Sequence, residues 1–166
     1  PDFITLDSAD GGTGAAPQSL MDNLGLTVWE SLPTVDKKLR DAGLRDRIKL
    51  IASGKMVNPS GVAAALCLGA DSVNTARGFM FALGCIQALQ CNQNTCPTGI
   101  TTHDPKLQKG LNPISKADRV ASYARSIKKE VELIAHSAGV MEPHNLGREH
   151  AFIIDAQGKP LPLLLH

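Results

Sequence analysis

Residues 74–99 read NTARGFMFALGCIQALQCNQNTCPTG, and the interpretation of the rest of the chain depends on this stretch. It begins with a turn at residues 74–78, directly after a strand-like run, and then carries Cys85, Cys91 and Cys96 in close succession. Pro97 follows the last cysteine. Cysteine thiolates are soft ligands that suit iron–sulfur clusters and zinc. The spacing therefore predicts a cysteine-bound metal group beside whatever the turn binds.

Other roles for the cysteines stay open at this point. Zinc usually takes four protein ligands, and the nearest additional ligand would be His103. Four cysteines could form two disulfides in a secreted domain, but three of them are clustered and Cys67 lies in an apolar helical run. We therefore expect Cys67 to be a small buried hydrophobe and the setting to be reducing and cytoplasmic.

Composition limits the range of functions. The 166 residues suit one domain, and a net charge of +1 gives no electrostatic argument for nucleic acid or an anionic membrane. Hydrophobic residues make up 43% and aromatic residues 4%, so the core must be aliphatic. No apolar run is long enough to cross a membrane. The chain opens with Pro1 at the edge of a strand-like run, which suggests a piece of a longer protein.

Apolar patterning predicts strands alternating with helices. The predicted strands cover residues 3–6, 48–52 and 71–75, and the predicted helices cover residues 18–40, 62–68, 79–90 and 115–138. In the first helix Gly25 is expected to break the pattern and Pro33 to open a second piece, and Ser115 with Asp118 is expected to form a capping box. Residues 91–115 are predicted to be loop, and 151–158 a hairpin.

Short connections between strand and helix favour parallel βα units. The chain is then either the C-terminal part of an eight-stranded (βα) barrel or a small open α/β sheet, because a whole barrel needs about 250 residues. The glycines at 11, 12 and 14 make either a flexible turn or a loop whose amides face an anionic ligand.

Four motifs follow one another along the chain: DGGTGA with Pro17 after the first strand, SGK after the second, GADSVNTARGFMFALGC, and C-x5-C-x4-CP-x-G. Together they resemble the synthase domain of glutamate synthases, and are most similar to the FMN-binding glutamate synthase family proteins. The resemblance covers roughly residues 1–140, leaves 141–166 as a tail, and departs from the large enzymes in having Lys55 where they have glycine.

The resemblance implies an α/β fold that supplies the last three βα units of a TIM-type (βα)8 barrel, with an iron–sulfur loop at 85–100 and a C-terminal helix. It also implies a [3Fe-4S] cluster held by Cys85, Cys91 and Cys96, and bound FMN. In such barrels phosphate sits on the loops after the last two strands. The expected FMN residues are Asp10, Gly11, Gly12, Thr13, Gly14, Ser53, Gly54, Lys55, Ala76 and Arg77.

The implied activity is that of an oxidoreductase acting on CH–NH2 donors, which reductively forms glutamate from 2-oxoglutarate with ammonia. Electrons would pass between the cluster and the flavin and reduce a 2-iminoglutarate intermediate. The family's catalytic residues are expected upstream of residue 1, so this chain alone should be inactive and should need the rest of the barrel or another subunit.

Two alternatives remain. A similar barrel could form N-methylglutamate from methylamine and glutamate. The chain could instead be a non-catalytic electron-transfer, cluster-binding or structural half-barrel module, whose exposed strand edges would favour a homo-oligomer.

Overall fold

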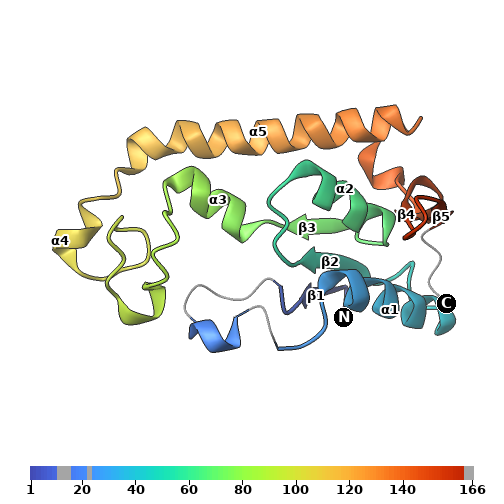
Figure 1. Cartoon of the computed structure of the whole chain (residues 1–166), viewed down its shortest axis with the longest axis horizontal. Helices are drawn as coiled ribbons and strands as arrows, with labels where there is room; N and C mark the ends of the chain where they lie inside the picture. Colours follow the sequence, from blue (N-terminus) through green and yellow to red (C-terminus); the bar gives the residue numbers. More distant parts are fainter. Residues whose placement is uncertain (11–15, 22–23, 163–166) are drawn as a thin grey trace.

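A three-stranded parallel sheet forms the centre of the fold (Figure 1). The structure is a computed structural model that describes residues 1–10, 16–21 and 24–162. The strands β1 (Phe3–Asp7), β2 (Lys49–Ser53) and β3 (Ser72–Asn74) lie in the order β1-β2-β3. Asp7 lies opposite Ser53, which lies opposite Asn74. Because all three strands run the same way, their carboxyl ends lie at one edge of the sheet.

The helices alternate with these strands and then continue beyond them. They are α1 (Val28–Asp41), α2 (Pro59–Cys67), α3 (Ala76–Leu83), α4 (Pro105–Gln108) and α5 (Pro113–Ser137), with 3-10 turns η1 (Gln18–Leu20), η2 (Cys91–Gln93), η3 (Pro143–Asn145) and η4 (Arg148–His150). Figure 1 shows α5 lying along α3 and α2, on the side away from the sheet. An antiparallel hairpin of β4 (Phe152–Ile154) and β5 (Pro160–Pro162) follows. Among the described residues, no helix combines the length and apolar character needed to cross a bilayer.

Two aliphatic clusters hold these layers together. The first joins α1 and α2 to one face of the sheet, with Leu32, Leu50 and Leu68 almost fully buried. The second joins α2, α5 and the tail, with Cys67 and Ala135 buried between the helices. On the opposite face of β1 the side chains of Phe3, Thr5 and Asp7 are exposed. A sheet covered on one face only is compatible with part of a barrel, whose interior this second face would line.

The three strands, their alternation with helices and the tail hairpin confirm the sequence-based predictions. For the first helix the break at Gly25 is confirmed, because Gly25 lies between η1 and α1 with φ of 103°. The expected start of a second piece at Pro33 was wrong: α1 is one helix that begins after Thr27, and Pro33 lies inside it. The start signal is a Thr-x-x-Glu pattern, because the backbone N–H and the hydroxyl of Thr27 donate to Glu30 over 3.0 and 2.7 Å.

Two other helix boundaries also differ. α3 ends at Leu83, well before the predicted residue 90, because Gly84 adopts a left-handed conformation with φ of 105° that ends the helix. The expected capping box at Ser115 was wrong: α5 begins earlier, because Asn112 Oδ1 accepts the N–H groups of Ile114 and Ser115. The short helix α4 lies within the predicted loop.

A buried carboxylate, Asp36 on α1, joins distant parts of the chain. Its side chain has no exposed surface, and it accepts hydrogen bonds from Arg40 (2.9 Å), Arg45 (2.7 Å) and Arg148 (2.8 Å). Arg45 also pairs with Asp71, just before β3, over 2.8 Å. Burial alone would raise the pKa of Asp36, but the hydrogen bonds from Arg40 and Arg45 outweigh it and lower that pKa. The network therefore ties α1, the starts of β2 and β3, and the tail together at the amino edge of the sheet.

We expect Asp36→Asn to lower the free energy of unfolding by about 3–5 kcal/mol, because it removes the buried charge that three arginines share. Urea unfolding followed by circular dichroism measures the change. Asp41→Asn is the matched control on the same helix: its pair with Lys37 is exposed and should contribute about 0–1 kcal/mol. Equal losses in the two variants would contradict this role for Asp36.

Candidate functional site

The loops that follow β1 and β2 meet at the carboxyl edge of the sheet. The N–H of Ser8 donates to the carbonyl of Ser53 over 3.0 Å, and the Ser53 hydroxyl donates to Asp7 Oδ1 over 2.9 Å. A Cβ built on Gly54 would lie 3.7 Å from Asp10 Oδ2, so these two residues are neighbours. The structure thus brings together Asp10, Ser53 and Gly54, which the sequence analysis had assigned to one site.

One carboxylate oxygen of Asp10 makes no hydrogen bond with the described residues. Its Oδ2 lies 3.5 Å from the N–H of Val28, at the start of α1. Its Oδ1 is buried and has no hydrogen-bond partner among the described residues. A buried carboxylate oxygen without a partner is uncommon in folded proteins and fits a donor group on a bound molecule. Gly11, Gly12, Thr13 and Gly14 lie outside the described residues, and their assignment stays a prediction.

The loop after β2 is a tight turn that needs glycine at its first position. A Cβ on Gly54 would come within 3.0 Å of the Val28 Cβ, so a larger residue would push the loop away from α1. Lys55 has a φ of 48°, the left-handed region that glycine adopts most easily, and the N–H of Val57 donates to its carbonyl over 2.7 Å. Lys55 therefore takes a glycine-like conformation at the position where the resemblance described above implies glycine.

The helices that follow β2 and β3 begin differently. At α2 the Asn58 side chain accepts the N–H of Gly61 over 2.7 Å and caps the helix. At α3, within the described part of the chain, Thr75 makes no side-chain capping hydrogen bond. The first N–H groups of a helix lack partners inside it and favour an anion. Ala76 and Arg77, expected in a loop, form the first turn of α3 at this open end.

Tyr123 on α5 also lies at this edge, and the sequence analysis did not assign it to the site. Its hydroxyl donates to the carbonyl of Val57 over 3.0 Å and lies 3.1 Å from the Thr75 hydroxyl. It therefore contacts the loops after both β2 and β3. Its place on the apolar face of α5 was visible in the sequence, but nothing there pointed to these polar contacts.

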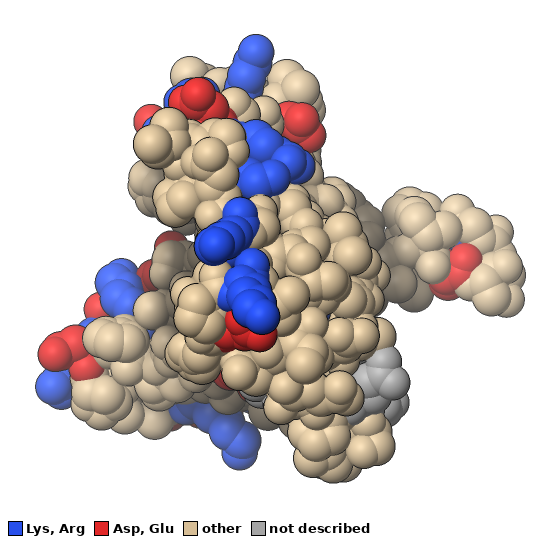
Figure 2. Space-filling model, turned by 90° about the vertical axis from the view of Figure 1, so that its left-hand side faces the viewer, with Lys and Arg blue, Asp and Glu red and all other residues tan. Residues whose placement is uncertain are grey.

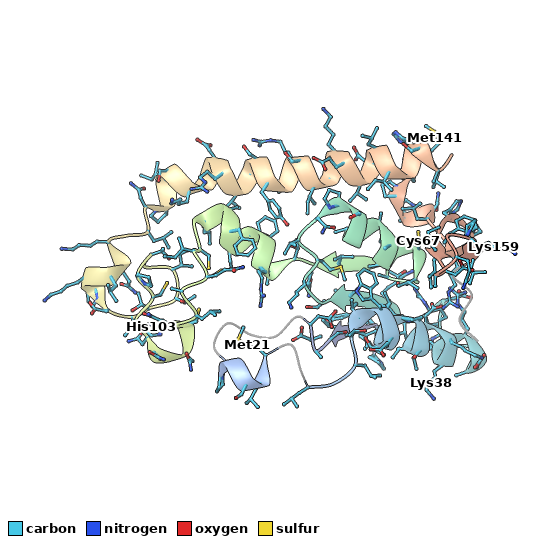
Figure 3. All side chains as sticks on the ribbon, viewed as in Figure 1. Met21, Lys38, Cys67, His103, Met141 and Lys159 are labelled. Atoms are coloured by element: carbon cyan, nitrogen blue, oxygen red, sulfur yellow. The ribbon has the colours of Figure 1, made fainter. Side chains whose placement is uncertain are left out.

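The predicted cysteine loop forms a lobe beyond α3, at the left of Figure 1. Cys85 follows the end of α3, Cys91 opens η2, and the buried Cys96 comes after it. All four cysteines are free thiols. Figure 3 shows His103 in this lobe, whereas Cys67 lies far from it on α2, buried as predicted. Within the residues that the structure describes, no three His, Cys, Asp or Glu side chains form a metal-binding group. The donor types fit a cluster, but the structure does not gather them around one point.

Cys96 nevertheless has the environment of a thiolate. Its sulfur lies 3.3 Å from the Thr98 hydroxyl, and backbone N–H groups of Thr98 and Thr101 point toward it. Burial would raise the pKa of this thiol, but these hydrogen bonds outweigh it and lower the pKa to about 6. The deprotonated form is the one that binds metals.

A surface hollow of about 420 Å³ is bordered by residues that neighbour both predicted cofactor regions in sequence. It is lined by Pro17, Ala88, Leu89, Gln90, Asn92 and Gln93. Pro17 follows the Gly11–Gly14 segment, and the other residues lie between Cys85 and Cys96. Residues next to the predicted flavin loop therefore border the cysteine lobe.

Figure 2 views the molecule from the side of this lobe. Lys and Arg side chains lie there among a larger area of uncharged residues, with a few acidic groups.

Comparison with known proteins gives one consistent family. A family model described as the conserved region in glutamate synthase matches residues 1–141. A glutamate synthase large subunit-like protein of Bacillus subtilis is 49% identical over 150 residues, which cover 90% of this chain and 29% of that protein. The archaeal glutamate synthase [NADPH] of Archaeoglobus fulgidus is 36% identical over 139 residues, which cover 84% of this chain and 27% of that protein. The chain thus spans less than a third of the length of these two relatives.

We expect the metal-free protein to gain thiolate absorbance near 240 nm as the pH rises through about 6, because Cys96 loses its proton there. Thr98→Val should move this midpoint up, toward the ordinary range of about 8.5, since it removes a hydrogen bond to the sulfur. Thr95→Val is the matched control, because the Thr95 hydroxyl donates to Gln90 rather than to Cys96. A midpoint that stays unchanged in Thr98→Val would contradict the assigned cause.

Proposed function

The chain belongs to the glutamate synthase family, and we propose that it supplies the last three βα units of an FMN-binding barrel in a glutamate-forming oxidoreductase. The family match over residues 1–141 and the in-order parallel sheet support this proposal. Several relatives are named glutamate synthase [NADPH]. The proposed reaction for the whole protein is the reduction of the imine of 2-oxoglutarate and ammonia, which takes two electrons and two protons and yields glutamate.

The observation that carries the FMN proposal is the uncapped start of α3 beside the tight turn after β2. An FMN phosphate fits an end of a helix that presents free N–H groups and the favourable end of the helix dipole. Arg77, in the first turn of α3, adds a guanidinium that can pair with phosphate oxygens. Gly54 and Lys55 supply the turn beside it, and Gly54 packs closely against Val28 of α1.

Asp10 is proposed to face the ring end of the flavin or the 2-oxo acid. Its buried Oδ1 lacks a partner among the residues described and can accept one N–H or O–H from either molecule. Asp10 lies in the loop after β1, beside Gly54 of the loop after β2. Bound FMN would supply hydride transfer, and the protein contributes binding, orientation and exclusion of water. The catalytic groups are proposed to lie upstream of residue 1.

A [3Fe-4S] cluster held by Cys85, Cys91 and Cys96 completes the proposal. The hydrogen-bonded thiol of Cys96 is already suited to bind iron. Pro17, next to the flavin loop, lines the same hollow as residues between these cysteines, which supports electron exchange between the two cofactors. Four free thiols suit the reducing, cytoplasmic setting that we propose.

We expect Arg77→Ala in the full-length protein to weaken FMN binding by about 10- to 100-fold, because a charge-assisted hydrogen bond to phosphate is lost. Riboflavin lacks the phosphate, so its affinity should stay nearly the same. Quenching of flavin fluorescence measures both dissociation constants. Arg125→Ala on the exposed side of α5 is the control and should change neither. Equal affinity of the unmodified protein for FMN and riboflavin would contradict the phosphate site.

We expect the anaerobically purified full-length protein to form glutamate from 2-oxoglutarate when ammonia is the nitrogen donor, with NADPH tested as the reductant because the relatives' names include it. Product analysis with methylamine and glutamate in place of ammonia tests the N-methylglutamate alternative. If the protein forms product with methylamine and glutamate but none with ammonia, the N-methylglutamate reaction replaces the proposed one.

Iron counting in the same preparations separates the cluster from the flavin. Cys91→Ala should lose bound iron, whereas Cys67→Ala should keep it, because Cys67 is buried between α2 and α5. Iron that remains at the unmodified level in Cys91→Ala would remove this cysteine from the proposed ligands.

A further inference from the structure

We propose that Asp7, Ser53 and Asn74, the last residues of β1, β2 and β3, form a polar row that hydrogen-bonds the ribityl chain of FMN. The inference rests on the proposed function, because this chain is part of that cofactor. The sequence analysis assigned Ser53 to the flavin, but neither Asp7 nor Asn74. The structure adds these two residues by placing them beside Ser53.

The register of the sheet puts the three side chains of the row on one face. Asp7 lies opposite Ser53, and Ser53 lies opposite Asn74. Successive side chains of a strand point to opposite faces. One residue earlier in each strand, the side chains pack into the aliphatic cluster with α1 and α2; they are Leu6, Ala52 and Val73. The row therefore lies on the face that these two helices do not cover, which a complete barrel would enclose.

The side chains of the row combine acceptors and donors of hydrogen bonds. The Ser53 hydroxyl donates to Asp7 Oδ1 over 2.9 Å. An ionised carboxylate can accept about four hydrogen bonds, so this bond leaves most of the acceptor capacity of Asp7 for other groups. Asn74, at the other end of the row, carries two N–H donors and one accepting oxygen. Both Asp7 and Asn74 are exposed in the described structure.

A carboxylate at this position does not suit a packed barrel interior. The interior of a (βα) barrel is filled mainly by branched apolar side chains. Asp7 would lie inside it, and a carboxylate that is enclosed there costs free energy unless hydrogen bonds compensate its charge. The single bond from Ser53 does not saturate it. A ligand that brings O–H donors to the ends of the strands would supply the missing hydrogen bonds.

Charge and position together indicate which part of the cofactor meets the row. Asp7 would repel the phosphate and the carboxylates of a 2-oxo acid, whereas the ribityl chain is uncharged and carries hydroxyl groups. The residues proposed for the phosphate follow β2 and β3, and Asp10, proposed for the ring end, follows β1. The row runs between these two ends. It crosses three strands that lie about 4.8 Å apart, and the resulting length of about 10 Å suits an extended ribityl chain.

The test compares FMN, riboflavin and lumiflavin in the full-length protein by quenching of flavin fluorescence. Riboflavin lacks the phosphate, and lumiflavin has a methyl group in place of the ribityl chain. We expect Asp7→Ala to weaken the binding of FMN and riboflavin by about tenfold or more, because hydrogen bonds to a charged acceptor are lost. Lumiflavin affinity should change by about twofold or less. Asn74→Ala should show the same pattern with a smaller loss, about threefold, since its hydrogen bonds are uncharged.

Thr5→Ala is the matched control. Thr5 is an exposed residue on the same face of β1, two positions before Asp7 and farther from the carboxyl edge. This variant should leave the affinities for all three flavins unchanged. A loss in Thr5→Ala as large as that in Asp7→Ala would contradict a specific role for the end of the strand.

The remaining outcomes separate this inference from the proposed function. An equal loss for riboflavin and lumiflavin in Asp7→Ala would indicate a general structural effect and overturn the inference. Unchanged riboflavin affinity would overturn it as well, and a loss confined to FMN would move Asp7 to the phosphate. If the unmodified protein binds lumiflavin as tightly as riboflavin, the ribityl chain is not held and the inference fails, although a flavin site remains. If it binds none of the three flavins, the proposed function itself fails.

Discussion

The parallel pairing of β2 with both β1 and β3 is the constraint on which the rest of the structure depends. It places all carboxyl ends at one edge and all amino ends at the other, and the two edges have different chemistry. At the amino edge the buried Asp36 is matched by three arginines, so that charges are compensated within the protein. At the carboxyl edge Asp10 keeps a buried oxygen without a partner among the described residues. In (βα) barrels, too, the amino ends of the strands serve stability, whereas the carboxyl ends carry the ligand sites.

Two successive βα units begin their helices in different ways. Asn58 caps α2 through its side chain, whereas Thr75 makes no side-chain cap at the start of α3, and its hydroxyl contacts Tyr123 of α5. The contacts at the start of α3 therefore include the long helix α5, in addition to the residues next to it in sequence.

In the cysteine lobe, Cys96 has local surroundings that favour its thiolate, but the three predicted ligands do not lie together. Hydrogen bonds within residues 96–101 are enough to lower the pKa of Cys96 and favour its thiolate. Gathering three thiols around one point is a longer-range property, and Cys85, Cys91 and Cys96 do not form such a group in the described structure. Because thiolate ligands attract metal and metal binding in turn organises a loop, the two properties need not arise together.

The sequence by itself determined the parallel βα order, because each short strand is followed by a small or polar residue, namely Ser8, Gly54 and Thr75, and then by a helix. It also determined the family, through motifs whose order and spacing are specific. The capping signal at Thr27 and Glu30 was readable and was missed. Only the tertiary structure decided the partners of Asp36 and Tyr123, which contact residues 112 and 66 positions away. No local pattern encodes contacts at such separations, since they form only when the sheet has brought its loops and the long helix together.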